Sequence, residues 1–168
     1  MNAALHIAQF WDGRAKDVEE QALGPILNPV EMGMPNEAAV VNKLKKIDDY
    51  KALFAEAFKD EKDPFQYKNV GKAIGAFERT LLTPSRFDDF LNGDESALND
   101  SEKRGLTKFM HMGCVTCHNG VVIGGNSYKK IGVVEPYETK DMGRFEVTGL
   151  ETDKKVFKVP SLRNITKT

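Results

Sequence analysis

The stretch of sequence that decides the fold is "HMGCVTCHNG", residues 111–120, which contains both cysteines of the 168-residue chain. Cys114 and Cys117 are three positions apart, and His118 follows directly. A C-x-x-C-H motif is typical of c-type haem attachment, in which two thiols form thioether bonds and the adjacent imidazole reaches the iron from one side. The spacing therefore predicts one covalently bound haem c, with His118 as an axial iron ligand.

Two other uses of the cysteine pair stay open as weaker alternatives. A structural zinc site needs four ligands, and the two remaining histidines, His6 and His111, are not paired with another ligand in the sequence. A thioredoxin-like dithiol would be expected near a βαβ pattern, whereas these cysteines follow a predicted helix. Both patterns fit the sequence less well than haem attachment does.

The composition excludes several classes of partner. The 24 Lys and Arg residues nearly balance the 25 Asp and Glu residues, and they are interspersed along the chain. This pattern predicts neither a nucleic-acid footprint nor a polybasic membrane patch. No apolar run approaches the roughly 18 residues of a membrane span. With 29% charged and 40% hydrophobic residues, the chain has the composition of a globular protein.

Hydrophobic periodicity predicts a mainly helical chain. Upstream of the motif, Asn99 and Glu102 form a capping-box pattern that predicts a helix running into Cys114. Asn36 is a predicted N-cap. The other expected elements are a short helix or turn over 2–11, a helix over 17–23 that stops at Gly24-Pro25, two helices over 37–58 and one over 70–81.

The remaining segments are expected to be irregular. Residues 23–36 carry three prolines and two glycines, which indicates a loop. Residues 83–96 are polar and suggest a hinge, so we expect one domain over 1–84 and a second over 85–168. After His118 the helical rhythm disappears, which predicts a loop-rich end with at most short strands.

Four blocks together resemble a known family. They are "QFWDGRAKDVEEQALGPILNPVEMGMP" (9–35), "AIGAFERTLLTP" (73–84), "FMHMGCVTCHNG" (109–120) and "FKVPSLRNIT" (157–166). The set is similar to the bacterial di-haem cytochrome c peroxidases, a group that includes MauG-like enzymes. The resemblance implies that residues 85–168 form a cytochrome c-like haem domain, incomplete at its end. It also implies that residues 1–84 form the helical second half of another, peroxidatic-side domain without its haem attachment motif.

The resemblance also implies roles for four residues outside the motif. Trp11 matches a tryptophan that passes electrons between two haems, although an aromatic residue is more often packed in a core. Gln21 and Glu31 match polar residues on the peroxide side. Glu31 would move a proton between the two peroxide oxygens, and Gln21 would donate or accept a hydrogen bond there. Thr168 matches a calcium-site threonine.

The implied activity is the reduction of hydrogen peroxide to water with electrons from a small c-type cytochrome or cupredoxin. The family is periplasmic, commonly homodimeric, carries a second haem and binds calcium between its domains. Two alternatives stay open: a single-haem c-type electron-transfer protein, and a MauG-like oxidase that acts on a protein side chain.

Both ends of the sequence are abrupt, and residues 1–6 do not have the pattern of a signal peptide. We therefore expect a longer protein, with a leader and a second C-x-x-C-H motif upstream and a methionine iron ligand downstream. Residues 1–168 alone are expected to be inactive. Met142 is a less favoured candidate for the second iron ligand within the chain.

Overall fold

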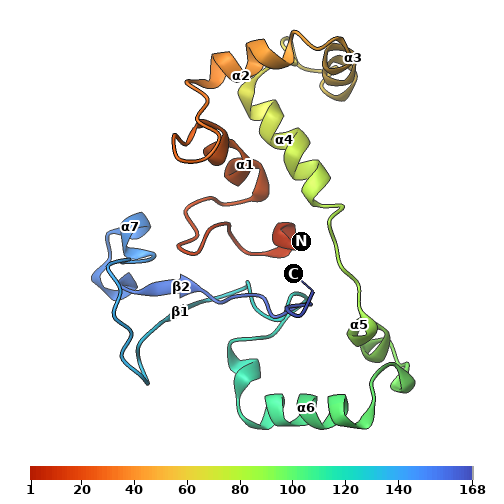
Figure 1. Ribbon diagram of the computed structural model, residues 1–168, viewed down its shortest axis with the longest axis vertical. Helices are drawn as coiled ribbons and strands as arrows, with labels where there is room; N and C mark the ends of the chain where they lie inside the picture. Colours follow the sequence, from red (N-terminus) through yellow and green to blue (C-terminus); the bar gives the residue numbers. More distant parts are fainter. Residues whose placement is uncertain (168) are drawn as a thin grey trace.

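The computed structural model describes residues 1–167, and helices make up most of its regular structure. Figure 1 shows two groups of helices, α1–α4 at the top and α5–α6 at the bottom, with a two-stranded sheet and the N-terminal segment between them. The expected mainly α fold class is confirmed. Within the described residues, no helix combines the length and the apolar character required to cross a membrane.

The first helical group contains most of the buried core. It consists of α1 (Val18–Leu27), α2 (Glu37–Leu44), α3 (Asp48–Ala57) and α4 (Tyr67–Glu78), after a 3₁₀ turn, η1 (Ala3–Leu5). The helices bury one cluster of side chains: Ile26, Val40, Phe54, Phe65, Tyr67 and Val70.

Helices α1 and α4 approach each other closely because α4 has a glycine at the crossing. A Cβ atom on Gly71 would lie 2.6 Å from the Glu19 carbonyl oxygen, which leaves no room for a side chain. At the edge of the crossing, Arg79, the residue directly after α4, forms an ion pair with the Glu19 carboxylate. The pair is partly exposed, so packing rather than charge holds the two helices together.

The predicted end of the first helix at Gly24-Pro25 is wrong. Helix α1 continues through Pro25 to Leu27. A proline inside a helix removes one hydrogen bond and costs about 3 kcal/mol. The next residue, Ile26, is 7% exposed in the core cluster, and burying such a side chain offsets much of that cost. The loop that follows therefore begins at Asn28 rather than at residue 23.

Both predicted helix caps are confirmed. The Asn36 side chain accepts a hydrogen bond of 2.9 Å from the Ala39 N–H at the start of α2. Asn99 and Glu102 form a reciprocal capping box at the start of α6, with bonds of 3.0 and 2.8 Å. These predictions succeeded because a cap depends only on residues within one turn.

The second helical group begins inside the segment that was predicted to be a polar hinge. It consists of α5 (Arg86–Leu91), a 3₁₀ turn η2 (Glu95–Ala97) and α6 (Asp100–His111). Ser85 and Asp88 form a capping box that starts α5, with the Ser85 N–H 2.7 Å from the Asp88 carboxylate. The hinge prediction over 83–96 therefore missed a short helix.

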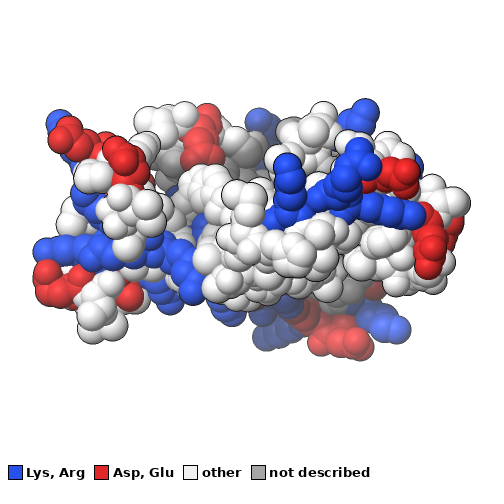
Figure 2. All heavy atoms as spheres, turned by 90° about the horizontal axis from the view of Figure 1, so that it is seen from below, with Lys and Arg blue, Asp and Glu red and all other residues white. Residues whose placement is uncertain are grey.

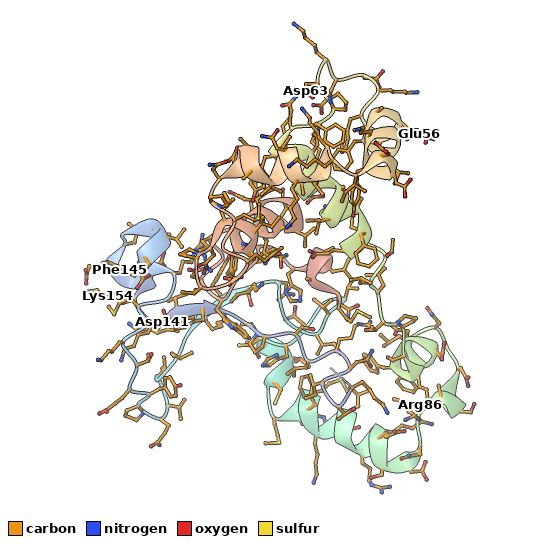
Figure 3. The ribbon with its side chains drawn as sticks, turned by 45° about the horizontal axis from the view of Figure 1, so that its top comes forward. Glu56, Asp63, Arg86, Asp141, Phe145 and Lys154 are labelled. Atoms are coloured by element: carbon orange, nitrogen blue, oxygen red, sulfur yellow. The ribbon has the colours of Figure 1, made fainter. Side chains whose placement is uncertain are left out.

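The end of the chain is largely irregular, as predicted. Strands β1 (Tyr128–Lys130) and β2 (Val156–Lys158) pair antiparallel, with Tyr128 opposite Lys158. Between them lie a single helical turn α7 (Phe145–Thr148) and a 3₁₀ turn η4 (Glu151–Asp153). Figure 3 shows Phe145 and Lys154 together here, and the Lys154 ammonium lies 5.0 Å from the Phe145 ring centroid.

The N-terminal segment packs against this C-terminal part as well as against α4. The Ile7 N–H donates to the Gly125 carbonyl at 2.9 Å, and the Lys158 N–H donates to the Trp11 carbonyl at 2.7 Å. Residues 1–12 thus contact both expected domains. The boundary between 84 and 85 stays a prediction.

Arg163 joins three segments of the chain: its own, residues 83–88 and the segment around residue 121. The Arg163 guanidinium donates to both Asp88 carboxylate oxygens at 2.7 and 2.6 Å. It also donates to the carbonyls of Thr83 and Val121, at 3.2 and 3.0 Å. The Arg163 side chain is only 9% exposed. This pair therefore fixes α5 against the segments around residues 83 and 121.

We expect Arg163→Met to lower the free energy of unfolding by about 2–4 kcal/mol, because the partly buried Asp88 carboxylate loses its partner. Arg86→Met is the matched control. Arg86 also binds a carboxylate through two bonds, that of Glu102, but its side chain is 64% exposed. Its loss is expected to cost about 1 kcal/mol or less. Urea unfolding of the haem-loaded protein measures both, and equal losses would contradict the prediction.

A pH dependence follows from the same pair. Hydrogen bonding from Arg163 holds the pKa of the Asp88 carboxyl well below its usual range. The unfolded chain, with a pKa of about 3.9, then binds a proton before the folded chain does. The stability from this pair is fully present above about pH 4 and is lost as the pH falls below that value. We expect the stability difference between the wild type and Asp88→Asn to shrink as urea unfolding is repeated toward about pH 3.

Candidate haem-attachment site

The C-x-x-C-H motif forms one tight turn directly after α6. The segment η3 (Cys114–Thr116) follows α6, and the Cys117 and His118 N–H groups both donate to the Cys114 carbonyl, at 3.2 and 2.9 Å. Gly113 has a φ of +81°, a left-handed conformation that ends α6 and lets the turn begin. Both cysteines are free and partly buried. The turn therefore holds two thiols and an imidazole within five residues.

This turn forms one wall of an apolar cavity of about 530 Å³. The volume lies within the range of about 300–1,000 Å³ that is usual for ligand and cofactor sites. Helices α5 and α6 supply two further walls, and the segment after β2 supplies another. The lining residues are Phe87, Leu91, Gly105, Leu106, Phe109, Met110, Val115, His118, Asn119, Gly120, Ile123 and Leu162.

The His118 ring is the chemically active part of this lining. Its Nδ1 atom is buried and has no hydrogen-bond partner among residues 1–167, and its ring centroid lies 6.4 Å from that of Phe109. A buried nitrogen without a hydrogen-bond partner costs free energy in a folded protein. Two thiols, an imidazole and apolar walls are the set that a covalently attached haem requires. The residues present therefore fit a haem c.

Neither Met142, the less favoured candidate for the second iron ligand, nor His111 lines the cavity. Met142 lines a separate recess of about 410 Å³ with Lys130 and Tyr137, so the structure does not place it at the haem cavity. His111 is exposed on the last turn of α6. In residues 1–167, no group of three or more His, Cys, Asp and Glu side chains is arranged to hold a metal ion. The cysteines follow a helix, as the sequence predicted.

Trp11 lies at a second recess. It is 61% exposed and, with Tyr137, Asp141 and Phe157, lines a hollow of about 480 Å³. Figure 3 shows Asp141 near the sheet, away from α5 and α6. Trp11 is not among the residues that line the haem cavity.

Gln21 and Glu31 are both carried by α1 and the turn that follows it. Gln21 is partly buried in α1, and Glu31 is exposed after it. A Glu31 carboxylate oxygen accepts a hydrogen bond of 2.7 Å from the Asn28 side-chain amide. Neither residue lines the haem cavity. Thr168, the expected calcium ligand, lies outside the described residues.

Residues 1–96 match the family model described as di-haem cytochrome c peroxidase. The chain belongs to the di-haem cytochrome c peroxidase family. Membership of this family implies haem c, which agrees with the geometry of the Cys114–His118 turn. The remaining part of the chain, including that turn, is covered by alignments to individual relatives.

The relatives include cytochrome c551 peroxidases of two bacteria. That of Nitrosomonas europaea is 49% identical, over 98% of this chain and 49% of its own length. That of Pseudomonas aeruginosa is 44% identical, with the same shares covered. A crystal structure of a MauG-like protein associated with microbial copper homeostasis superposes with a TM-score of 0.80 at 29% identity, covering 96% of this chain and 53% of that one. The chain spans about half the length of the curated relatives it matches.

The walls of the haem cavity were not predicted from the sequence. Phe87 and Leu91 are four residues apart on α5, a spacing that marks one helix face, but they lay inside the predicted hinge. Leu162 belongs to the block "FKVPSLRNIT", which was used for the family resemblance without a role for that residue. The i, i+4 apolar pair and the Ser85–Asp88 capping-box spacing were the signals that could have found α5.

We expect Cys114→Ala and Cys117→Ala each to leave the haem held by one thioether, and the double variant to lose covalent haem. His118→Ala is expected to keep the haem attached but to change its absorption spectrum, because the iron loses an axial ligand. Mass spectrometry of the unfolded protein and absorption spectra measure the two effects. His111→Ala, exposed on α6, is the control and should match the wild type in both. A double cysteine variant that kept covalent haem would contradict the assignment.

Proposed function

We propose that the whole protein containing this chain is a cytochrome c peroxidase. It reduces each hydrogen peroxide to two waters, consuming two electrons and two protons. The electrons come from a small c-type cytochrome or a cupredoxin. The observation that supports this most is the Cys114–His118 turn opening on an apolar cavity, in a chain of the di-haem peroxidase family.

The cavity at His118 is proposed as the electron-accepting site. A haem c bound there supplies one-electron redox chemistry at its iron. The residues of this chain hold it in place: Cys114 and Cys117 by thioethers, and His118 from one face. The apolar walls exclude water from the ring, and a low-dielectric surrounding of this kind tunes the redox potential.

Glu31 is proposed as the residue that moves protons on the peroxide side. Its turn is fixed by two bonds to the Asn28 carbonyl, from the Glu31 N–H at 3.0 Å and the Gly33 N–H at 2.9 Å. The Asn28 amide also orients the carboxylate. A positioned carboxylate takes a proton from one oxygen and delivers it to the other. Gln21, in the same helix–turn unit, hydrogen-bonds the peroxide or a water.

Trp11 is proposed as the electron route between this haem and a second one bound by a segment outside this sequence. Its large exposed ring at the edge of the second recess supports a role outside the core. By the same resemblance, we propose that calcium lies between the two domains. The full-length protein is proposed to be a periplasmic homodimer.

The surface around the haem cavity supports a small redox protein as the partner. Exposed apolar residues gather there, including Leu91, Met110 and Val115. Lys103, Arg104 and Lys108 lie beside them on α6. Figure 2, seen from the α6 end, shows a broad area of uncharged atoms with Lys, Arg, Asp and Glu atoms at its sides. Such a face suits a donor with an apolar centre and a charged rim.

Two other functions make different predictions. A single-haem electron carrier would exchange electrons with a donor but would not consume peroxide. A MauG-like oxidase would use peroxide to oxidise a protein side chain; the fold similarity to a MauG-like structure keeps this alternative in view. Peroxide-dependent oxidation of a reduced small cytochrome, with two molecules oxidised per peroxide, supports the peroxidase and argues against both.

We expect Glu31→Ala to lower kcat for peroxide reduction by on the order of 100-fold or more, because general acid–base catalysis typically contributes 10²–10⁴-fold. The measurement is steady-state oxidation of a reduced cytochrome by the full-length protein. Covalent haem content should stay unchanged, since Glu31 lies outside the haem cavity.

Glu37→Ala is the matched control. Glu37 is also exposed and begins the next helix, α2, and its removal is expected to leave kcat as in the wild type. Unchanged turnover in Glu31→Ala would remove Glu31 from the mechanism.

A further inference from the structure

Lys158, in β2, is a buried lysine. It is 6% exposed, and lysine is almost never fully buried unless it is paired. Its ammonium donates to the Ala8 carbonyl at 2.6 Å and lies 3.2 Å from His6 Nδ1. Within residues 1–167 it forms no ion pair. Burial lowers the pKa of Lys158, and the nearby Asp12 charge offsets part of that effect.

The histidine facing Lys158 is neutral at neutral pH. Burial and the facing ammonium lower the pKa of His6 to about 4. The Nδ1 lone pair is therefore free to accept from the lysine. A buried cation held by two neutral acceptors is costly compared with an apolar side chain of similar size. Stability alone gives no reason for a lysine here, so its contacts point to another task.

Two hydrogen bonds from Lys158 bind the chain segment that carries Trp11. Besides the ammonium bond to the Ala8 carbonyl, the Lys158 N–H donates to the Trp11 carbonyl at 2.7 Å. One residue thus holds two carbonyls three positions apart. A second cation, Arg144, donates to the Asp12 carbonyl at 3.1 Å.

The backbone between those two carbonyls is strained. Phe10 has a φ of +63°, which is an outlier for a bulky residue. Such a conformation costs of order 1–3 kcal/mol and persists only where the surroundings over-determine it. The Arg14 guanidinium carbon lies 3.5 Å from the Phe10 ring centroid. Residue 158 binds the chain on both sides of Phe10, through its ammonium at Ala8 and through its main-chain N–H at Trp11. These two bonds from residue 158, called the Lys158 clamp below, therefore maintain a turn that would otherwise relax.

Trp11 depends on this turn for its position. The ring is 61% exposed, so core packing does not fix it, whereas its backbone is fixed by β2. We infer that Lys158 is the positioning residue for Trp11. Its ammonium holds the Ala8 carbonyl on one side of the strained turn, while the main-chain N–H of the same residue holds the Trp11 carbonyl on the other side. The side chain thereby sets the position of the indole at the second recess. This inference rests on the proposed function, because it takes Trp11 as the electron route.

The test uses the haem-loaded full-length protein. Trp11 is the single tryptophan in this sequence, so its indole N–H cross-peak in a ¹⁵N–¹H spectrum reports its position, and Trp11→Phe assigns that peak. Lys158→Met keeps the aliphatic stem but removes the charge and the ammonium donors. The cross-peak is expected to shift or split, and kcat for peroxide-dependent oxidation of the donor to fall on the order of tenfold with KM unchanged.

Lys129→Met is the matched control. Lys129 lies on the paired strand β1, opposite Phe157, and its side chain is exposed. This variant should keep the wild-type cross-peak and kcat. Thermal unfolding and haem absorption verify that each variant is folded and loaded. If Lys158→Met yields no haem-loaded protein, Lys158→Arg is used as the test variant instead. The guanidinium is larger than the ammonium and does not fit in its place, so this variant is also expected to shift the Trp11 cross-peak.

The outcomes separate this inference from the proposed function. An unmoved Trp11 cross-peak in the Lys158 variant overturns the inference, whatever the turnover. A moved cross-peak with unchanged kcat overturns the functional part of the inference. If Trp11→Phe itself leaves kcat unchanged, the proposed electron route fails, while the cross-peak still decides whether Lys158 positions the ring.

Discussion

The ion pair between Arg163 and Asp88 is the contact on which the haem cavity depends. Asp88 lies on α5 beside the cavity residue Phe87, and Arg163 follows the cavity residue Leu162. By also binding the Thr83 and Val121 carbonyls, Arg163 connects residues 83–88 to the segment after the cysteine turn. The wall on α5, the wall after the cysteine turn and the wall after β2 are far apart in the sequence, and these bonds hold them together. A charge-assisted pair with two parallel bonds suits this task because it specifies orientation as well as distance.

Thr83, whose carbonyl accepts a hydrogen bond from Arg163, also binds residues near both ends of the described chain. The Asn2 side chain donates to the Thr83 hydroxyl at 2.7 Å, and the Asn164 side chain donates to the Thr83 carbonyl at 2.9 Å. Thr83 thus links the N-terminal segment, the connection between the helical groups and the segment after β2. Relative motion of the two groups would have to break these bonds together. The haem cavity and the turn that carries Trp11 are consequently parts of one framework, joined through β2 and the residues that follow it.

Apolar burial is uneven along the chain. The main core cluster draws only on residues 26–70, whereas the buried hydrophobic residues after residue 84 are Val122 and Val159 among those described. The apolar side chains of α5 and α6 instead face the cavity. A porphyrin attached at the cysteines would cover those faces. Because apolar burial drives folding, we expect haem attachment and the folding of this part to be coupled, as metal binding and folding are in small metalloproteins.

The sequence by itself determined the local features: the caps at Asn36 and Asn99, the irregular C-terminal third, and the turn that holds Cys114, Cys117 and His118. Each depends on residues within a few positions of one another, so pattern and chemistry suffice to predict it. Only the tertiary structure decided that α1 runs through Pro25, because the compensating burial of Ile26 comes from α4 and other distant residues. The same holds for the cavity walls on α5 and for the Lys158 clamp on the Trp11 turn. Those contacts join residues 75 to 150 positions apart, and no local pattern encodes such pairings.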